Sequence, residues 1–159
     1  MKIFVDSSVF LKLLFNEPGA DKAQEILESI ESNKVIGYVT PLVLEEVVFK
    51  LLYGKASELL NTKNIWRIRE ALRYDEGIRR KCLETIREFY GYIDYMYTRG
   101  LRVEYVTYDD WRKSLEYMKK HGLLPADALH LAVASRIGVT TIATFDEDFK
   151  YVDNIKTIP

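Results

Sequence analysis

The sequence predicts an α/β sandwich built on a mostly parallel sheet. Short apolar runs of strand length recur along the chain, and segments with helical spacing separate them, an alternation typical of parallel sheets. The length of 159 residues fits one domain, so we expect a single domain over 1–159. Apolar residues make up 48% of the chain and charged residues 30%, which is typical of a folded globular protein and excludes a disordered one.

The cellular setting is predicted from what the sequence lacks. Cys82 is the only cysteine, which excludes a disulfide scaffold and fits a reducing compartment. No apolar run approaches the roughly 18 residues of a membrane span, and the first residues do not form a signal peptide. We therefore expect a cytoplasmic protein with no membrane partner.

The predicted strands are short apolar runs. The first covers residues 2–5 and stops at Asp6, which indicates a buried strand with a polar end. The remaining strands are predicted at residues 35–39, 103–106 and 141–144, with a possible fifth at 155–158.

The predicted helices lie between these runs. Thr40 followed by Pro41 is a helix start signal, and we expect that helix to end near Gly54. Residues 55–100 look helical throughout, as two or three helices with a break near 75–77. Further helices are predicted at residues 20–30, at 109–120, and from 125 to a stop at Gly138.

Acidic residues follow the predicted strands. Asp6 directly follows the first strand, and Asp146 follows the fourth almost directly. Glu45 and Glu46 lie at the start of the helix after the second strand, and Asp127 lies at the start of a later helix. Ligands of open α/β sheets bind beyond the carboxyl ends of the strands, so acids from four distant segments can converge on one edge.

Such a cluster predicts a hard metal ion. Two unit charges about 4 Å apart cost roughly 1 kcal/mol in water and about 4 kcal/mol at an effective dielectric of 20. A divalent cation relieves this repulsion, and Mg²⁺ or Mn²⁺ prefers oxygen ligands. One cysteine and two histidines offer little for zinc.

Each acid also has a purely structural interpretation. Asp127 could interact with its helix dipole, worth about 0.3–1 kcal/mol. Asp146 could belong to an exposed acidic turn, and Glu45 and Glu46 could be an ordinary acid pair at a helix start. Asp6 is the hardest to explain in this way, because it ends an apolar strand at the expected mouth of the site.

Other enzymes with acids at a sheet edge fit less well. A phosphatase with an aspartyl nucleophile on the first strand usually has a second aspartate two residues later, where this chain has Ser8. A receiver domain needs a lysine near the last strands, which residues 140–146 lack. A dinucleotide-binding domain needs a glycine-rich turn after the first strand, and none is present.

Four segments together resemble a known nuclease family. They are Ile-Phe-Val-Asp-Ser-Ser-Val at 3–9, Thr-Pro-Leu-Val-Leu-Glu-Glu-Val at 40–47, Ala-Asp-Ala-Leu-His-Leu-Ala-Val-Ala at 126–134 and Ala-Thr-Phe-Asp-Glu-Asp-Phe at 143–149. In order and spacing the chain resembles PIN-domain nucleases, particularly the VapC-like toxins of prokaryotic toxin–antitoxin pairs. The resemblance implies a three-layer α/β/α sandwich with a central, mostly parallel sheet of four to five strands.

The resemblance also implies the site residues. The four family acids fall on Asp6, Glu46, Asp127 and Asp146, as catalytic residues and metal ligands. Glu46 is preferred because it lies six residues after Thr40, although the adjacent Glu45 could be confused with it. The supporting residues implied around these acids are Ser7, Ser8, Thr144 and Asp148.

The activity implied is Mg²⁺- or Mn²⁺-dependent cleavage of RNA phosphodiester bonds, leaving 5′-phosphate and 3′-hydroxyl ends. The implied partners are an RNA substrate, a small antitoxin protein and a second copy of the chain in a homodimer. The RNA target and the choice between one and two ions stay open. Two alternatives also stay open: a catalytically weak PIN-like module that binds RNA or protein, and an RNA-processing nuclease without an antitoxin.

The middle of the chain, the Arg- and Tyr-rich helical segment 55–102, suggests RNA binding. Residues 63–102 carry a net charge of +4, from ten Lys/Arg and six Asp/Glu, although the whole chain is at −1. Arginine binds phosphate through two parallel hydrogen bonds, and aromatic rings stack on unpaired bases. We therefore expect RNA contacts here, with Arg79, Arg80 and Lys81 as candidates. The alternative is a solvated helix pair whose tyrosines pack inward and whose arginines and glutamates form ordinary surface ion pairs.

Overall fold

The computed structural model describes all residues, 1–159, and the chain forms two compact units. The sheet unit comprises Met1–Leu44 and Met96–Pro159, and the helical unit comprises Glu45–Tyr95. The single domain expected over 1–159 stays a prediction. None of the helices combines the length and the apolar composition that crossing a membrane requires.

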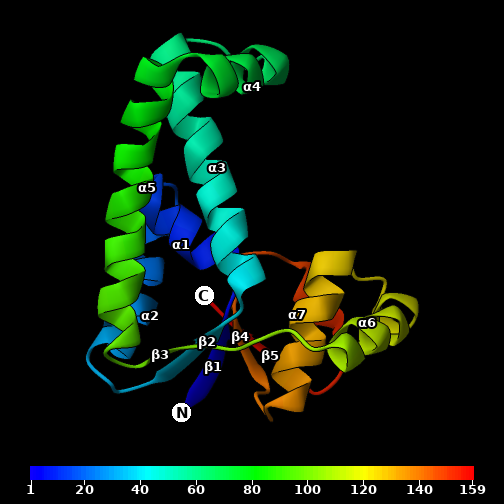
Figure 1. The fold of residues 1–159 in the computed structure, drawn as a ribbon. Helices are drawn as coiled ribbons and strands as arrows, with labels where there is room; N and C mark the ends of the chain where they lie inside the picture. The colour runs from blue at the N-terminus through cyan, green and yellow to red at the C-terminus, as the bar shows by residue number, and fades with distance from the viewer. The chain divides into compact units, whose positions relative to one another are not determined.

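The sheet unit is built on five parallel strands in the order β3-β2-β1-β4-β5 (Figure 1). The strands are β1 (Lys2–Val5), β2 (Ile36–Val39), β3 (Leu101–Val103), β4 (Thr141–Ala143) and β5 (Lys156–Ile158). In the register, Ile3 lies beside Gly37 and Val5 beside Ala143. The central strand β1 therefore has a neighbour on each side up to the point where it ends.

Helices cover both faces of this sheet (Figure 1). The helices of the sheet unit are α1 (Ser7–Leu14), α2 (Ala20–Glu31), α6 (Tyr108–His121) and α7 (Pro125–Arg136), with the 3₁₀ turn η1 (Asp148–Tyr151). A Cβ placed on Gly37 would come within 2.5 Å of Ile30 in α2, so α2 packs closely on that face. Phe4 points to the opposite face, where its ring lies 5.5 Å from that of His130 in α7. The three-layer α/β/α prediction is confirmed.

The helical unit contains most of α3 (Pro41–Leu60), α4 (Ile65–Tyr74) and most of α5 (Glu76–Tyr97). Its buried core is formed by Ala56, Ile68 and Cys82, one residue from each of the three helices. Burial raises the pKa of the Cys82 thiol, despite the opposing charge of Lys55, as expected for a structural cysteine.

Two predicted boundaries are wrong. The helix expected to end near Gly54 continues to Leu60, because a glycine inside a helix costs only about 0.5–1 kcal/mol and the following turn buries Ala56 in the core. The strand expected at 103–106 is β3 at Leu101–Val103, because its partner β2 ends at Val39. The last bond between them, from Glu104 N to Val39 O, is 2.8 Å long.

Candidate active site

Asp6 ends the central strand β1 and is only 3% exposed. Its backbone N–H donates to Ala143 O at 3.0 Å, which continues the pairing of β1 with β4 for one more residue. Its side chain caps α1, because Oδ2 accepts from the backbone N–H of Ser8 at 3.3 Å and from Ser8 Oγ at 2.6 Å. Backbone pairing with β4 and the capping of α1 therefore fix the Asp6 carboxylate at the carboxyl edge of the sheet.

Thr144 connects Asp6 to the segment after β4. Its buried hydroxyl donates to Asp6 Oδ2 at 3.0 Å and accepts from the backbone N–H of Asp146 at 3.0 Å. The Ser8 hydroxyl makes a parallel link, because it accepts from Phe145 N at 3.0 Å while donating to Asp6. Two hydroxyl groups therefore hold two acid-bearing segments against each other.

The two oxygens of the Asp6 carboxylate have different surroundings. All three hydrogen bonds from Ser8 and Thr144 reach Oδ2, and none reaches Oδ1. An oxygen at this edge that accepts from no protein donor is open to a ligand, because ligands of open α/β sheets bind beyond the carboxyl ends of the strands. Carboxylate and hydroxyl oxygens are the donors that surround it, and this donor set fits a hard divalent cation.

Asp127 approaches the same edge from α7. It lies in the first turn of this helix and is half-buried. The helix runs opposite to the strands, so its first turn lies at their carboxyl ends (Figure 1). One turn later His130 packs against Phe4, two residues before Asp6. The sheet unit thus brings Asp6, Asp127 and Asp146 to one edge.

The other predicted site residues are placed as follows. Ser7 is buried at the first position of α1, whereas Asp148 is exposed at the start of η1. Glu46 belongs to the helical unit, is half-buried and pairs with Lys50 at 2.7 Å, while Glu45 is exposed. The assignment of Glu46 to the site stays a prediction.

Comparison with known proteins establishes the family. The family model described as PIN domain matches residues 3–155. This chain belongs to the PIN domain family. The resemblance found in the sequence is therefore confirmed, and the match spans nearly the whole PIN domain chain.

Individual relatives agree with this assignment. The PIN domain chain is 29% identical to Ribonuclease VapC2 of Methanocaldococcus jannaschii over 157 residues, covering 99% of this chain and 93% of the relative. The solved structure of VapC20 from Mycobacterium tuberculosis, described as a Sarcin-Ricin loop cleaving toxin, superposes with a TM-score of 0.59 at 20% identity, over 99% of both chains. A toxin–antitoxin complex from Klebsiella pneumoniae superposes with a TM-score of 0.55 at 14% identity, over 99% of this chain and 96% of that one. At these identities the two structures show a shared fold.

The metal ligands of this PIN domain stay a prediction. No three His, Cys, Asp or Glu side chains are grouped closely enough to hold a metal ion as they stand. The support for a metal comes from Asp6, whose Oδ1 has no hydrogen bond while Oδ2 has three.

The predicted RNA contacts in the PIN domain fall into two kinds. Arg80 and Lys81 are exposed on α5. Arg79 is instead half-buried, and its guanidinium donates to the carbonyl oxygens of Leu72 and Arg73 at 3.3 and 3.1 Å. Arg79 therefore has a structural role, which is to hold the last turn of α4.

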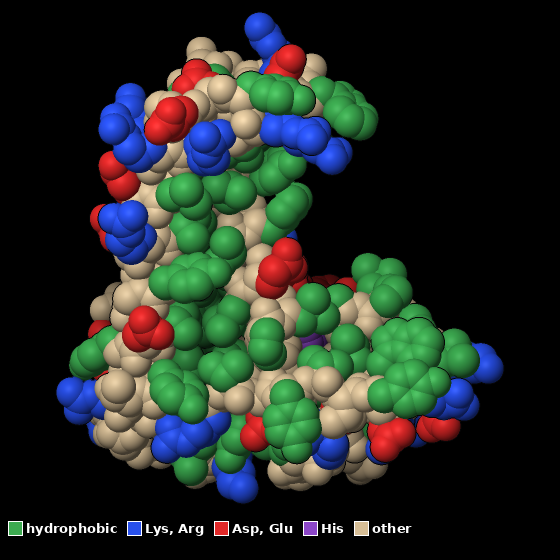
Figure 2. Space-filling view, in the orientation of Figure 1, with side chains coloured by type: hydrophobic (Ala, Val, Ile, Leu, Met, Phe, Trp, Pro, Cys, Tyr) green, Lys and Arg blue, Asp and Glu red, His purple; other side chains and the backbone are tan.

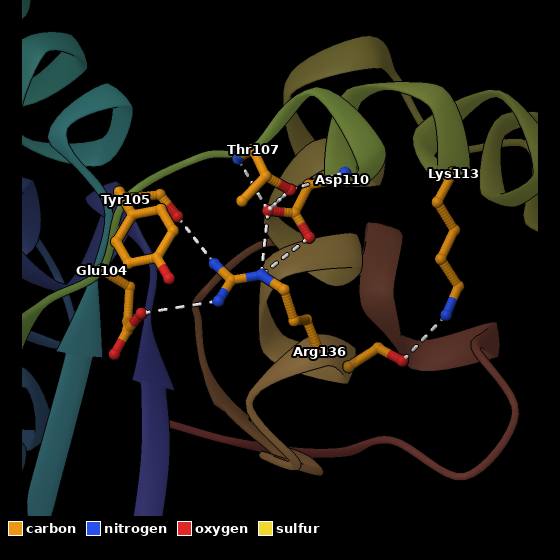
Figure 3. A network of polar contacts seen from close by, with 7 residues as sticks. Glu104, Tyr105, Thr107, Asp110, Lys113 and Arg136 are labelled. Atoms are coloured by element: carbon orange, nitrogen blue, oxygen red, sulfur yellow. Dashed lines mark hydrogen bonds and ion pairs between the residues drawn. The ribbon is translucent and has the colours of Figure 1, made fainter.

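A polar network that was not predicted from the sequence links the first turn of α6 to the end of α7 (Figure 3). Asp110 is buried, and Arg136 Nε at the end of α7 donates to both of its carboxylate oxygens at 3.0 Å. The same guanidinium donates to Tyr105 O at 2.7 Å and pairs with Glu104 Oε2 at 3.7 Å. These contacts fasten the chain between β3 and α6 to α7, the helix that carries Asp127.

Asp110 is held in its charged form. Burial by itself raises the pKa of Asp110, but hydrogen bonds from the Thr107 backbone and hydroxyl, together with Arg136, bring this pKa below its ordinary value. Thr107 and Asp110 form a reciprocal capping box, and their spacing of three residues was the signal available in the sequence. The partner Arg136, 26 residues further along the chain, had no such signal.

Proposed function

We propose that this PIN domain protein is a metal-dependent endoribonuclease that hydrolyses RNA phosphodiester bonds. The observation that carries the proposal is the buried Asp6 carboxylate, oriented through Oδ2 and without a hydrogen bond at Oδ1. It lies where open α/β sheets bind ligands. The similarity to a ribonuclease over 99% of the chain supports the same activity.

The proposed ligands of Mg²⁺ or Mn²⁺ are Asp6, Asp127, Asp146 and Glu46. Such an ion, when bound, activates a water molecule and stabilises negative charge on the phosphate. Ser8 and Thr144 orient the Asp6 carboxylate, and Thr144 also positions the backbone that carries Asp146. Oriented ligands with fixed hydrogen-bond partners are a general requirement of metal sites.

The test compares the wild-type protein with Asp6→Asn on a mixed RNA pool, with EDTA, Mg²⁺ or Mn²⁺. A metal ion supplies several kcal/mol of transition-state stabilisation, so we expect Asp6→Asn to lower the cleavage rate at least about 100-fold. Asp109→Asn, an equal change of charge at an exposed position of α6, is the matched control and should cleave normally. A second readout is thermal unfolding, since a bound metal raises the Tm of the wild type and not of Asp6→Asn.

Each outcome has one meaning. Cleavage by wild type and Asp109→Asn alone, abolished by EDTA, supports the proposed nuclease. Equal cleavage by Asp6→Asn refutes the assignment of the site. No cleavage by folded wild-type protein under any condition favours the alternative of a binding module.

We further propose that the protein is the toxin of a toxin–antitoxin pair, binds a small antitoxin and forms a homodimer. The fold shared with a member of the Klebsiella pneumoniae toxin–antitoxin complex supports an antitoxin partner. Expression of the wild type, but not of Asp6→Asn, should then arrest growth, and a gene encoded beside it should relieve the arrest. Normal growth together with active cleavage in vitro would favour an RNA-processing nuclease without an antitoxin.

A further inference from the structure

Helix α4 presents an aromatic and basic surface that neither the active site nor the family match explains. Trp66 is 76% exposed, although tryptophan is mostly buried in folded proteins. Arg69 and Arg73 are exposed three and seven residues later, so they lie on the same face of the helix as Trp66. Ile68 is buried on the opposite face, against Ala56 and Cys82. Figure 2 shows hydrophobic side chains beside Lys and Arg side chains over this helix.

A second aromatic and basic pair lies on the neighbouring side of α4. Arg67 and Tyr74, seven residues apart, line a cavity of about 420 Å³, whose other polar residues are Thr62 and the acids Glu70 and Asp75. Tyr74 is 74% exposed, and the Arg73 guanidinium lies 5.6 Å from the centre of its ring. A cavity of this volume is within the range that accommodates a small ligand.

The arginines of α4 are available to an anion. Residues 63–74 contain four Lys/Arg and one Asp/Glu, a net charge of +3, whereas the whole chain has −1. The solvated-helix alternative expected Arg69, Glu70 and Arg73 to form ion pairs, but none of these residues does so. It also expected tyrosines that pack inward, which the exposed side chain of Tyr74 contradicts.

The helix is held firmly at both ends. Asn64 caps its first turn, because Oδ1 accepts from the backbone N–H groups of Trp66 and Arg67 at 3.0 and 3.2 Å. Arg79 from α5 holds its last turn through the carbonyl oxygens of Leu72 and Arg73. A surface fixed in this way loses little conformational freedom when it binds a ligand.

We propose that α4 is a binding platform for single-stranded RNA, with Trp66 and Tyr74 stacking on unpaired bases and Arg67, Arg69 and Arg73 binding the phosphates. Positive charge combined with exposed aromatic rings is the chemistry that recognises unpaired nucleic acid, because every base offers a face for stacking. The choice of RNA as the occupant rests on the proposed nuclease function. This surface differs from the predicted RNA contacts Arg79, Arg80 and Lys81. Of these, Arg79 already donates to backbone carbonyl oxygens in the last turn of α4.

The test measures binding separately from cleavage. The parent protein is the full chain with Asp6→Asn and Trp111→Phe, kept in EDTA, so that Trp66 is the only tryptophan. Its fluorescence should be quenched by oligouridylate, a single strand without secondary structure. Because stacking is worth about 1–3 kcal/mol per base, Trp66→Ala should raise the Kd, measured with labelled RNA, about 5- to 140-fold, while Trp66→Phe should retain most of the affinity.

Charge is tested with two matched double variants. Arg69→Ala with Arg73→Ala should reduce the slope of log K against log salt by about 1.4, at about 0.7 per phosphate contact on a single strand. Arg80→Ala with Lys81→Ala removes the same charge from α5 and should change the slope less. A duplex RNA, whose bases are paired, should bind equally to the Trp66→Ala variant and its parent.

Three outcomes would overturn the platform. The first is an unchanged Kd of Trp66→Ala for single-stranded RNA. The second is an equal reduction, in both double variants, of the slope of log K against log salt. The third is loss of binding to an acidic antitoxin by Trp66→Ala with RNA binding intact, which would make α4 a protein-docking surface. Failure of the nuclease test affects none of these measurements, so the two proposals fail separately.

Discussion

Replacing Thr144 with valine tests the active-site geometry most directly. Valine has the shape of threonine and lacks its hydroxyl, so Asp6 Oδ2 loses one of its three donors and Asp146 N loses its acceptor. A hydrogen bond to a charged group contributes about 1.5–3 kcal/mol and a neutral one about 0.5–1.5 kcal/mol. The better burial of a valine methyl group offsets part of this loss, so we expect about 2–3 kcal/mol of destabilisation.

This change should appear in two assays. In thermal unfolding, 2–3 kcal/mol corresponds to a fall in Tm of about 5–10 °C for a chain of this size. In RNA cleavage, loss of an orienting partner of a metal ligand typically costs 10- to 100-fold in activity or metal affinity, and we expect roughly that range. Thr144→Ser retains the hydroxyl and should restore most of both properties.

Thr141→Val is the matched control for valine in β4. Thr141 is half-buried at the start of β4, the strand that Thr144 directly follows, and its side chain makes no hydrogen bond, so both properties should stay near those of the wild type. If Thr144→Val cleaves RNA and binds Mn²⁺ as the wild type does, the Thr144 hydroxyl does not orient Asp6. If Thr144→Val and Thr141→Val lose stability equally, the loss comes from the strand and not from the hydroxyl.

Two further predictions concern the scaffold. Asp110→Asn should lower the free energy of unfolding by about 2–4 kcal/mol at neutral pH, because it breaks a largely buried charge pair with Arg136. Folding lowers the pKa of Asp110, so its contribution to the free energy of unfolding is complete above the unfolded pKa of about 3.9 and is lost as the pH falls through the folded pKa. In denaturant titrations, the free energies of unfolding of the wild type and Asp110→Asn should therefore converge only below about pH 4. Gly100→Ala should cost at least about 3 kcal/mol, because its Cβ would overlap the backbone carbonyl oxygen of Ile30. Gly37→Ala would instead meet the Ile30 side chain, which can shift more easily than backbone, and should cost about 1–2 kcal/mol. Equal losses for the two glycine variants, or a pH-independent gap for Asp110→Asn, would contradict this reasoning.

Much of the architecture could be predicted because it depends on local pattern. Apolar runs that stop at a polar residue indicated where β1 and β4 end, and Thr40 with Pro41 indicated where α3 begins. The rule that ligands bind at the carboxyl ends of parallel strands then selected Asp6 and Asp146. The boundary error at Gly54 shows the limit of such patterns, because burial of Ala56 outweighs a weak local preference.

The sequence by itself determined the fold class, the order of the elements and the family, because periodicity, capping residues and short motifs act over a few neighbouring positions. The tertiary structure decided which groups meet. The Thr144 hydroxyl donates a hydrogen bond to Asp6, 138 residues earlier, and the Arg136 guanidinium donates to Asp110. It also decided that Trp66 faces solvent and that Arg79 holds α4. These contacts depend on strand register and helix packing, which bring distant residues within hydrogen-bond range and leave no trace in the local sequence.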